Sequence, residues 1–301
     1  MTLAAPASRL PWLGIAAGVF GVVGFSTLLV VGRLGATSQT LTLYDLAGLR
    51  HSVSILCALP ILIRIWPWRL SLKQHLILSV FGGAPFLIIL FAGMTLAPVA
   101  HAAIVVNGTL PLMAAIVAWL WLRQLPGRWQ VVGMVVAGGG VLLVGWEVLA
   151  FGVPGQWRGH LLFLAAAGSI AVWYSAIRLW GLTVAETIVG HLVLNAVVYV
   201  PIWLFFLPSG ITTAPPQDIL LQAVILGVWG AFIATYGHAY AARTLGPTRQ
   251  AAIMSGGPAL AALLAIPVLG ETPSALAIAG IAVVATGILM TVGAGLRSEA
   301  R

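Results

Sequence analysis

Long apolar stretches are the feature that most limits what this chain can fold into. Cutting the sequence at charged residues, prolines and glycine clusters leaves ten of them, at residues 12–32, 42–65, 73–96, 101–122, 129–147, 158–178, 184–206, 218–242, 248–269 and 275–295. Each is long enough to cross a hydrocarbon layer of about 30 Å as a helix. Because backbone polar groups in lipid must bond within their own segment, we expect an all-α polytopic membrane protein with ten transmembrane helices, not a β-barrel.

The composition agrees with this expectation. Of 301 residues, 61% are hydrophobic and 7% are charged, and the mean hydropathy is +1.09, which is more apolar than the surface of a soluble globular protein allows. The first apolar stretch runs past the length of a signal peptide, so we expect it to be retained as the first span. A single cysteine, Cys57, excludes an internal disulfide, and the sequence has no P-loop, HExxH or CxxC motif. We therefore expect no metal and no cofactor.

Basic residues indicate the orientation. If the N-terminus is cytoplasmic, the ten spans place 11 of the 14 basic residues on the cytoplasmic side, and the three exceptions are Arg33, Arg50 and Arg158. The positive-inside rule then puts both termini in the cytoplasm, and we expect the spans to lie in a bacterial inner membrane. The net charge of +8 reflects attraction to anionic lipid and gives no reason to expect nucleic acid as a partner.

An internal repeat divides the chain in two. "PLMAAIVAWLWLRQLPG" (111–127) overlies "PALAALLAIPVLGETPS" (258–274) at an offset of 147, which also carries Gly133 onto Gly280 and Gly140 onto Gly287. Upstream, "TLAPVAHAAI" (95–104) overlies "TLGPTRQAAI" (244–253), and Asp45, Arg50 and Pro60 overlie Glu186, His191 and Pro201. Five spans are an odd number, so we expect two inverted five-helix repeats, residues 1–150 and 151–301, an arrangement typical of transporters with a site near the bilayer midplane.

The chain resembles the drug/metabolite transporter superfamily, in its ten-helix EamA-type branch. The resemblance rests on the two halves, on "WLGIAAGVFGVVGFST" in the first span, on Arg50, and on "PALAALLAIPVLGE" ending at Glu271, where the first half has Gln124 instead. It implies a secondary transporter, not an enzyme, that exports small neutral or zwitterionic solutes by alternating access through a central cavity. In length and character the chain is similar to the aromatic amino-acid exporters of that branch, which implies such amino acids as the substrate.

Polar and aromatic residues inside the spans are the candidate substrate-binding residues, namely Tyr44, Arg50, Asn107, Trp173, Tyr236, Tyr240 and Ser255. Arg50 would lie about 12 Å into the second span, where it either holds a substrate carboxylate or pairs with Asp45 while reaching the interface. Trp173 lies too deep for the interfacial aromatic belt, so it either packs or stacks on an aromatic substrate. Tyr236 and Tyr240 share one face of the eighth span.

Two further patterns suggest how the spans are built. Residues 95–104 overlie 244–253 at an offset of 149, and from Pro111 onward the offset is 147, so the first half has two extra residues between Ile104 and Pro111. They predict a bulge or unwound turn at Asn107, or else a shifted loop boundary. Ser255 lies in the corresponding stretch of the second half. His191, Asn195 and Tyr199 recur every four residues, so their stripe either bonds to a neighbouring helix or lines the cavity. Gly138, Gly139 and Gly140 allow close approach of another backbone.

Missing residues exclude some transport classes. No carboxylate lies in the interior of a predicted span, which disfavours the cation/proton antiport of the superfamily's small members, and only Arg50 is placed to bind a phosphate. The alternatives are an exporter of lipophilic drugs or other metabolites, a membrane-embedded lipid-modifying enzyme using Asp45 and His51, and a non-transporting assembly subunit. We expect a small-molecule substrate and membrane lipid as partners, and a monomer is one possible state.

Overall fold

The computed structural model describes residues 11–65, 69–245 and 253–299, and every regular element in these ranges is a helix. The first half contains α1 (Pro11–Ala36), α2 (Leu43–Ile65), α3 (Leu72–Gly82), α4 (Ala84–Leu96), α5 (Val99–Leu122) and α6 (Arg128–Phe151). The second contains α7 (Gln156–Trp180), α8 (Val184–Leu194), the π-helix η1 (Asn195–Tyr199), α9 (Val200–Phe206), α10 (Pro216–Gln222), the π-helix η2 (Ala223–Ala234), α11 (Thr235–Leu245), α13 (Gly257–Leu269) and α14 (Ala275–Glu299).

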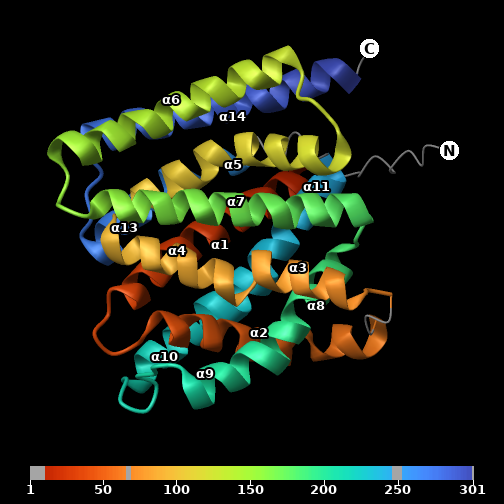
Figure 1. Cartoon of the computed structure of the whole chain (residues 1–301), viewed down its shortest axis with the longest axis vertical. Helices are drawn as coiled ribbons and strands as arrows, with labels where there is room; N and C mark the ends of the chain where they lie inside the picture. The colour runs from red at the N-terminus through yellow and green to blue at the C-terminus, as the bar shows by residue number, and fades with distance from the viewer. Residues whose placement is uncertain (1–10, 66–68, 246–252, 300–301) are drawn as a thin grey trace.

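Nine helical stretches within the described residues are long and apolar enough to cross a membrane, which confirms a multi-pass membrane protein. Three of them combine several elements: α3 with α4, α8 with η1 and α9, and α10 with η2. The predicted span 248–269 is represented by α13, which has 13 residues, and residues 248–252 lie outside the described ranges. A tenth crossing therefore stays a prediction. Figure 1 shows the start of α1 and the end of α14 on the same side, opposite the α6–α7 turn.

Equivalent positions of the repeat end their helices in the same way. Arg123 after α5 and Gly270 after α13, 147 positions apart, both have left-handed backbones, with φ of 54° and 69°. The next residue donates its N–H back to Ala118 O in one half and to Ala265 O in the other, so carbonyls left free at the helix end are bonded. Glycine adopts this conformation without strain, and Arg123 adopts it at a cost. The repeat found in the sequence is therefore also a repeat of backbone geometry.

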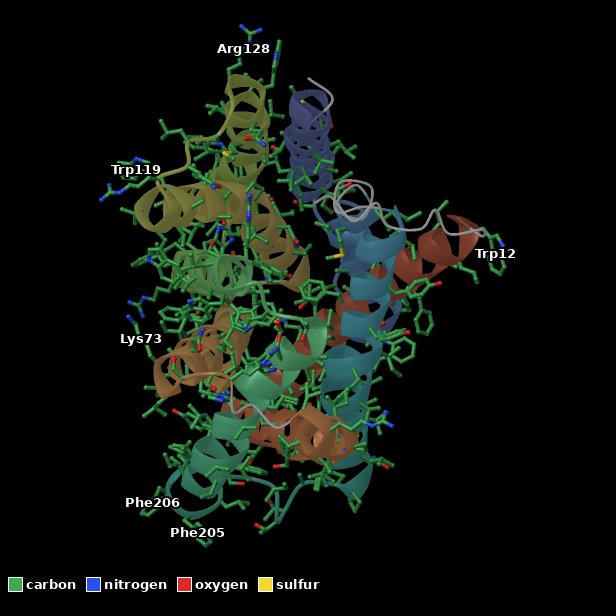
Figure 2. The ribbon with its side chains drawn as sticks, turned by 90° about the vertical axis from the view of Figure 1, so that its right-hand side faces the viewer. Trp12, Lys73, Trp119, Arg128, Phe205 and Phe206 are labelled. Atoms are coloured by element: carbon green, nitrogen blue, oxygen red, sulfur yellow. The ribbon has the colours of Figure 1, made fainter. Side chains whose placement is uncertain are left out.

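The helices α6 and α14 make the most extensive helix-pair contact among the described residues and lie side by side at one edge of the molecule (Figures 1 and 2). A β-carbon added to Gly133 would lie 2.7 Å from the carbonyl oxygen of Gly287, and one added to Gly140 would lie 2.7 Å from that of Gly280. Gly138 has nothing within 4 Å. The close approach predicted for residues 138–140 is therefore made by Gly140, because Gly138 and Gly139 lie on other faces of α6.

Large apolar side chains cover the outside of the bundle. Leu142 and Leu149 are each 74% exposed, Phe205 is 78% exposed and Phe206 is 80% exposed. Figure 2 shows the two phenylalanines at the margin of the molecule, pointing away from the ribbon. A surface of this kind is unfavourable in water and suits contact with lipid acyl chains.

Candidate substrate-binding site

The α2 helix is bound to η2 through backbone carbonyls. Arg50 Nη1 donates to Leu226 O at 3.1 Å, and one turn later Ser54 Oγ donates to Gly227 O at 2.9 Å. A π-helix bonds each N–H to a carbonyl five residues back, so the change of register from the neighbouring α-helices leaves carbonyls available to other donors. Gly227 also lets α2 approach, because a β-carbon there would lie 2.7 Å from Val53 Cβ. The irregular helix thus provides the acceptors that hold Arg50.

Asp45 is not the partner of Arg50, so that alternative is wrong. The Asp45 carboxylate is fully buried and accepts hydrogen bonds from Trp203 Nε1 at 2.8 Å, from Gly210 N at 2.9 Å and from Thr42 N at 2.7 Å. Asp45 thereby joins the first turn of α2 to α9 and to the loop after it. It makes no acid–base pair with His51, whose two ring nitrogens have no hydrogen-bond partner, so the lipid-modifying enzyme loses its nearest candidate pair.

We define the central polar cluster as Arg50, His51, Trp173, His191 and Tyr199, which come from α2, α7, α8 and η1. Ring contacts connect four of its members, and Arg50 is included because it precedes His51 in α2 and its Nε is buried without a partner. The His51 ring centroid lies 6.2 Å from that of His191 and 6.3 Å from that of Tyr199. The Trp173 ring lies 6.1 Å from His191 at an interplanar angle of 88°. The structure thus brings Trp173 into ring contact with His191, while Arg50, the residue before His51 in α2, directs its guanidinium to Leu226 O of η2.

The stripe on the seventh span bonds to neighbouring helices, the first of its two predicted roles. Asn195 accepts a hydrogen bond from Ala84 N at 3.0 Å and donates to Ser79 O at 3.3 Å, across the break between α3 and α4. Tyr199 Oη donates to Tyr44 O at 3.0 Å. Tyr44 therefore reaches the cluster through its backbone carbonyl.

Several buried polar atoms of the cluster have no hydrogen-bond partner: Arg50 Nε, both ring nitrogens of His51 and Trp173 Nε1. Buried donors are nearly always paired, and leaving one unpaired costs about 1–3 kcal/mol. The guanidinium and indole N–H groups are donors, and a neutral imidazole supplies one more. This set suits a carboxylate, and the surrounding rings suit an aromatic group. The described residues contain no group of three or more His, Cys, Asp or Glu side chains that could hold a metal.

Asn107 lies in an unbroken helix, so the predicted bulge or unwound turn is wrong. Its amide donates to Ala103 O, one turn earlier in α5, at 2.8 Å. The interruption lies in the other half, where Ser255 and Gly256 form a turn before α13. The difference in length between the halves is thus taken up by a broken helix in the shorter half. Ser255 is buried in that turn.

The last two predicted residues lie on α11. The Tyr236 and Tyr240 rings stack on each other with centroids 6.2 Å apart, which confirms their shared face. Tyr236 is 67% exposed. Neither has a described ring contact with the central polar cluster, and their part in binding stays a prediction.

Three members of the cluster were not among the predicted site residues: His51, and His191 and Tyr199, which were predicted only as part of a polar stripe. His51 follows Arg50 directly. It is a second ionisable residue inside a span, and this signal could have identified it from the sequence. Trp229 lies in η2, where its ring packs 4.9 Å from Phe20 and its Nε1 is buried without a partner. No periodicity in the sequence distinguishes a π-helix from an α-helix, so Trp229 gave no comparable signal.

No curated protein matches the chain. A crystal structure of another protein matches with a TM-score of 0.60 and 19% sequence identity, over 90% of this chain and 97% of that one, and shows the same fold. The model of the EamA-like transporter family matches residues 12–146 and again residues 157–293. With nine apolar helices among the described residues, two copies of this repeat and a buried polar cluster between helices, the chain belongs to the EamA-like transporter family.

Proposed function

We propose that this protein is a ten-helix secondary transporter of the bacterial inner membrane that exports aromatic amino acids by alternating access. Membership of the family makes it a membrane transporter of small solutes. The proposal adds the substrate, the direction, the cytoplasmic position of both termini, and binding at the central polar cluster.

The glycine contacts support an inverted repeat with halves 1–150 and 151–301. Gly133 contacts Gly287, and Gly140 contacts Gly280. The repeat offset of 147 makes Gly133 equivalent to Gly280 and Gly140 equivalent to Gly287, so the two contacts join equivalent pairs of residues. Each contact is therefore the image of the other. Low residue numbers on α6 face high numbers on α14, so the helices are antiparallel. A two-fold axis in the membrane plane relates segments in this way.

The unpartnered donors of the cluster are the observation that carries the substrate assignment. Arg50 supplies a permanent positive charge inside a span, which is costly unless an anion or a wet cavity compensates it. A substrate carboxylate would accept from Arg50 Nε and from a neighbouring N–H, while its ring would lie against Trp173 or Tyr199. A zwitterionic aromatic amino acid has both groups.

The burial of these donors supports alternating access. The unpartnered atoms have almost no contact with solvent, so a substrate reaches them only after the surrounding helices separate. The carbonyl contacts of Arg50 and Ser54 with η2 are few and can break and re-form. We therefore place the moving boundary between α2 and η2.

Flux of tryptophan and phenylalanine into and out of proteoliposomes tests the proposal. Arg50→Gln removes the charge, and a lost hydrogen bond to a charged group is worth about 1.5–3 kcal/mol, so we expect tryptophan flux to fall at least about tenfold. Arg64→Gln, at the exposed end of the same helix, is the control and should leave flux unchanged.

Substrates without a carboxylate separate this proposal from export of lipophilic drugs. Indole should neither be carried at the rate of tryptophan nor respond to Arg50→Gln. Equal flux of indole and tryptophan, both unaffected by Arg50→Gln, would favour a transporter of lipophilic solutes. Absence of flux for every solute would favour an assembly subunit.

A further inference from the structure

A second site lies away from the central polar cluster, in a cavity of about 180 Å³ at the end of the bundle where the α6–α7 turn lies. Its walls come from the start of α5, the end of α6, α13 and the α13–α14 turn. The polar lining includes His101, Glu147, Gln156, Glu271 and Ser274. At about 30 Å³ per water, this volume equals about six water molecules. It is enough for a small organic molecule.

The two carboxylates of the cavity differ in how they are bonded. Glu271 Oε1 accepts from Arg33 Nε at 2.7 Å, and its Oε2 accepts from Val99 N at 3.0 Å. Its charge and both of its oxygens are therefore engaged. Glu147 has no cation within ion-pair distance among the described residues, and its Oε2 is buried with no hydrogen-bond partner. Glu147 is the group in this cavity that needs a donor.

The nearby histidines do not supply that donor. His101 Nδ1 and His160 Nε2 lie 3.1 Å apart and share one hydrogen bond, and both side chains are buried. A hydrogen bond between these two nitrogens needs one N–H donor and one unprotonated acceptor, so at least one of the two rings is neutral. The histidines therefore bond to each other, and neither donates to Glu147 Oε2 in this arrangement.

We propose that this cavity binds the ammonium group of a small organic amine, with Glu147 as the acceptor. An ammonium group brings three N–H donors and one positive charge, and buried carboxylates require compensation of both kinds. Gln156 Oε1 and Ser274 Oγ already accept from Val153 N and Ala277 N, and each has a second lone pair for a further donor. The apolar part of the amine lies against Phe151 and Val153, which line the cavity and are 78% and 73% exposed at its rim. The site is separate from the central polar cluster and does not depend on the substrate proposed above.

Titration of phenethylamine into the full-length protein in phosphatidylcholine nanodiscs, with empty nanodiscs as the blank, tests this inference by calorimetry. We expect one site per chain. The carboxylate analogue 3-phenylpropionate, which has the same ring and no ammonium, should not compete. Glu147→Gln should weaken phenethylamine binding at least tenfold, and Glu147→Asp, which keeps the charge, should weaken it less.

Two control variants locate the site. Asp218→Asn removes a carboxylate from α10 and should leave binding unchanged, as should Arg50→Gln in the central polar cluster. All variants are compared only where their size-exclusion profile matches that of the unaltered protein. Binding that survives Glu147→Gln, or that is lost in Arg50→Gln, would overturn the proposal, as would the absence of any binding. The flux assays above are read independently, so either proposal can fail alone.

Discussion

The α6–α14 pair and the α2–η2 contact are opposite ways of packing helices in this protein. The first is regular and apolar, and its glycines bring two backbones together at equivalent positions of both halves. The second joins an α-helix to a π-helix through an arginine and a serine that donate to backbone carbonyls. Unpartnered buried atoms gather around the second contact. The comparison indicates that the glycine pair holds the two halves together, and that the polar contact is where the protein can change.

Gly140→Leu should have the largest effect, because it attacks the regular contact. The new side chain would meet the Gly280 carbonyl, which lies 2.7 Å from the position of its β-carbon, and the helices would have to separate at a cost of about 3 kcal/mol or more. We expect a much smaller monodisperse fraction and a lower thermal midpoint by fluorescence-detected size exclusion. Gly287→Leu, at the equivalent position, should behave alike.

Gly138→Leu is the matched control for this prediction, because a β-carbon at Gly138 meets nothing within 4 Å. It should leave the thermal midpoint almost unchanged. Equal losses at positions 138 and 140 would show that α6 tolerates no large residue anywhere, and the comparison between the two contacts would then lose its basis.

Trp173→Ala should have the next largest effect, and on flux more than on folding. If Trp173 supports the aromatic ring of the substrate, its loss removes about 1.4 kcal/mol of binding, which is about a tenfold drop in tryptophan flux. The control in the same proteoliposomes is Trp146→Ala, because the side chain of Trp146 on α6 is 65% exposed. Unchanged flux in the Trp173 variant would remove this residue from the site.

The smallest effect should come from Asn107, which is compared here with a second asparagine, Asn195. Asn195→Ala leaves Ala84 N without an acceptor at the α3–α4 break and should cost about 1–3 kcal/mol. Asn107→Ala breaks only a bond within its own helix and should cost about 0.5 kcal/mol. Thermal midpoints measure both. A flux loss in the Asn107 variant smaller than that of Trp173→Ala would keep Asn107 as a secondary binding residue, and no loss would exclude it.

Much of the fold could be predicted from the sequence, because lipid leaves few choices. Apolar stretches must become helices, and capping groups mark where they begin: Thr183 and Glu186 form a capping box at α8. The repeat was visible because glycines at helix contacts cannot be exchanged for larger residues. The length of the ninth segment was less predictable. Ser255 and Gly256 interrupt it just before Pro258, but the equivalent Pro111 lies inside the unbroken α5, so a proline did not by itself mark a break.

The candidate site was predictable only in part. Arg50 and Trp173 are conspicuous because charged and aromatic residues are costly or rare deep in a span. Which partner Arg50 binds was not predictable, since a backbone carbonyl freed by a π-helix leaves no trace in the residue types. The bulge predicted at Asn107 was wrong because the sequence pattern was assigned to the wrong half. A difference in offset shows that one half is longer, and it does not show which half is broken.

The reciprocal glycine contact is also self-complementary, since the surface of α6 that meets α14 is equivalent to the surface of α14 that meets α6. Two separate copies of one half, inserted in opposite directions, would offer each other the same surfaces. Joining both halves in one polypeptide thus adds no new contact. It fixes the stoichiometry at one to one, raises the effective concentration of each half near the other, and lets the two sides of the transport path acquire different residues.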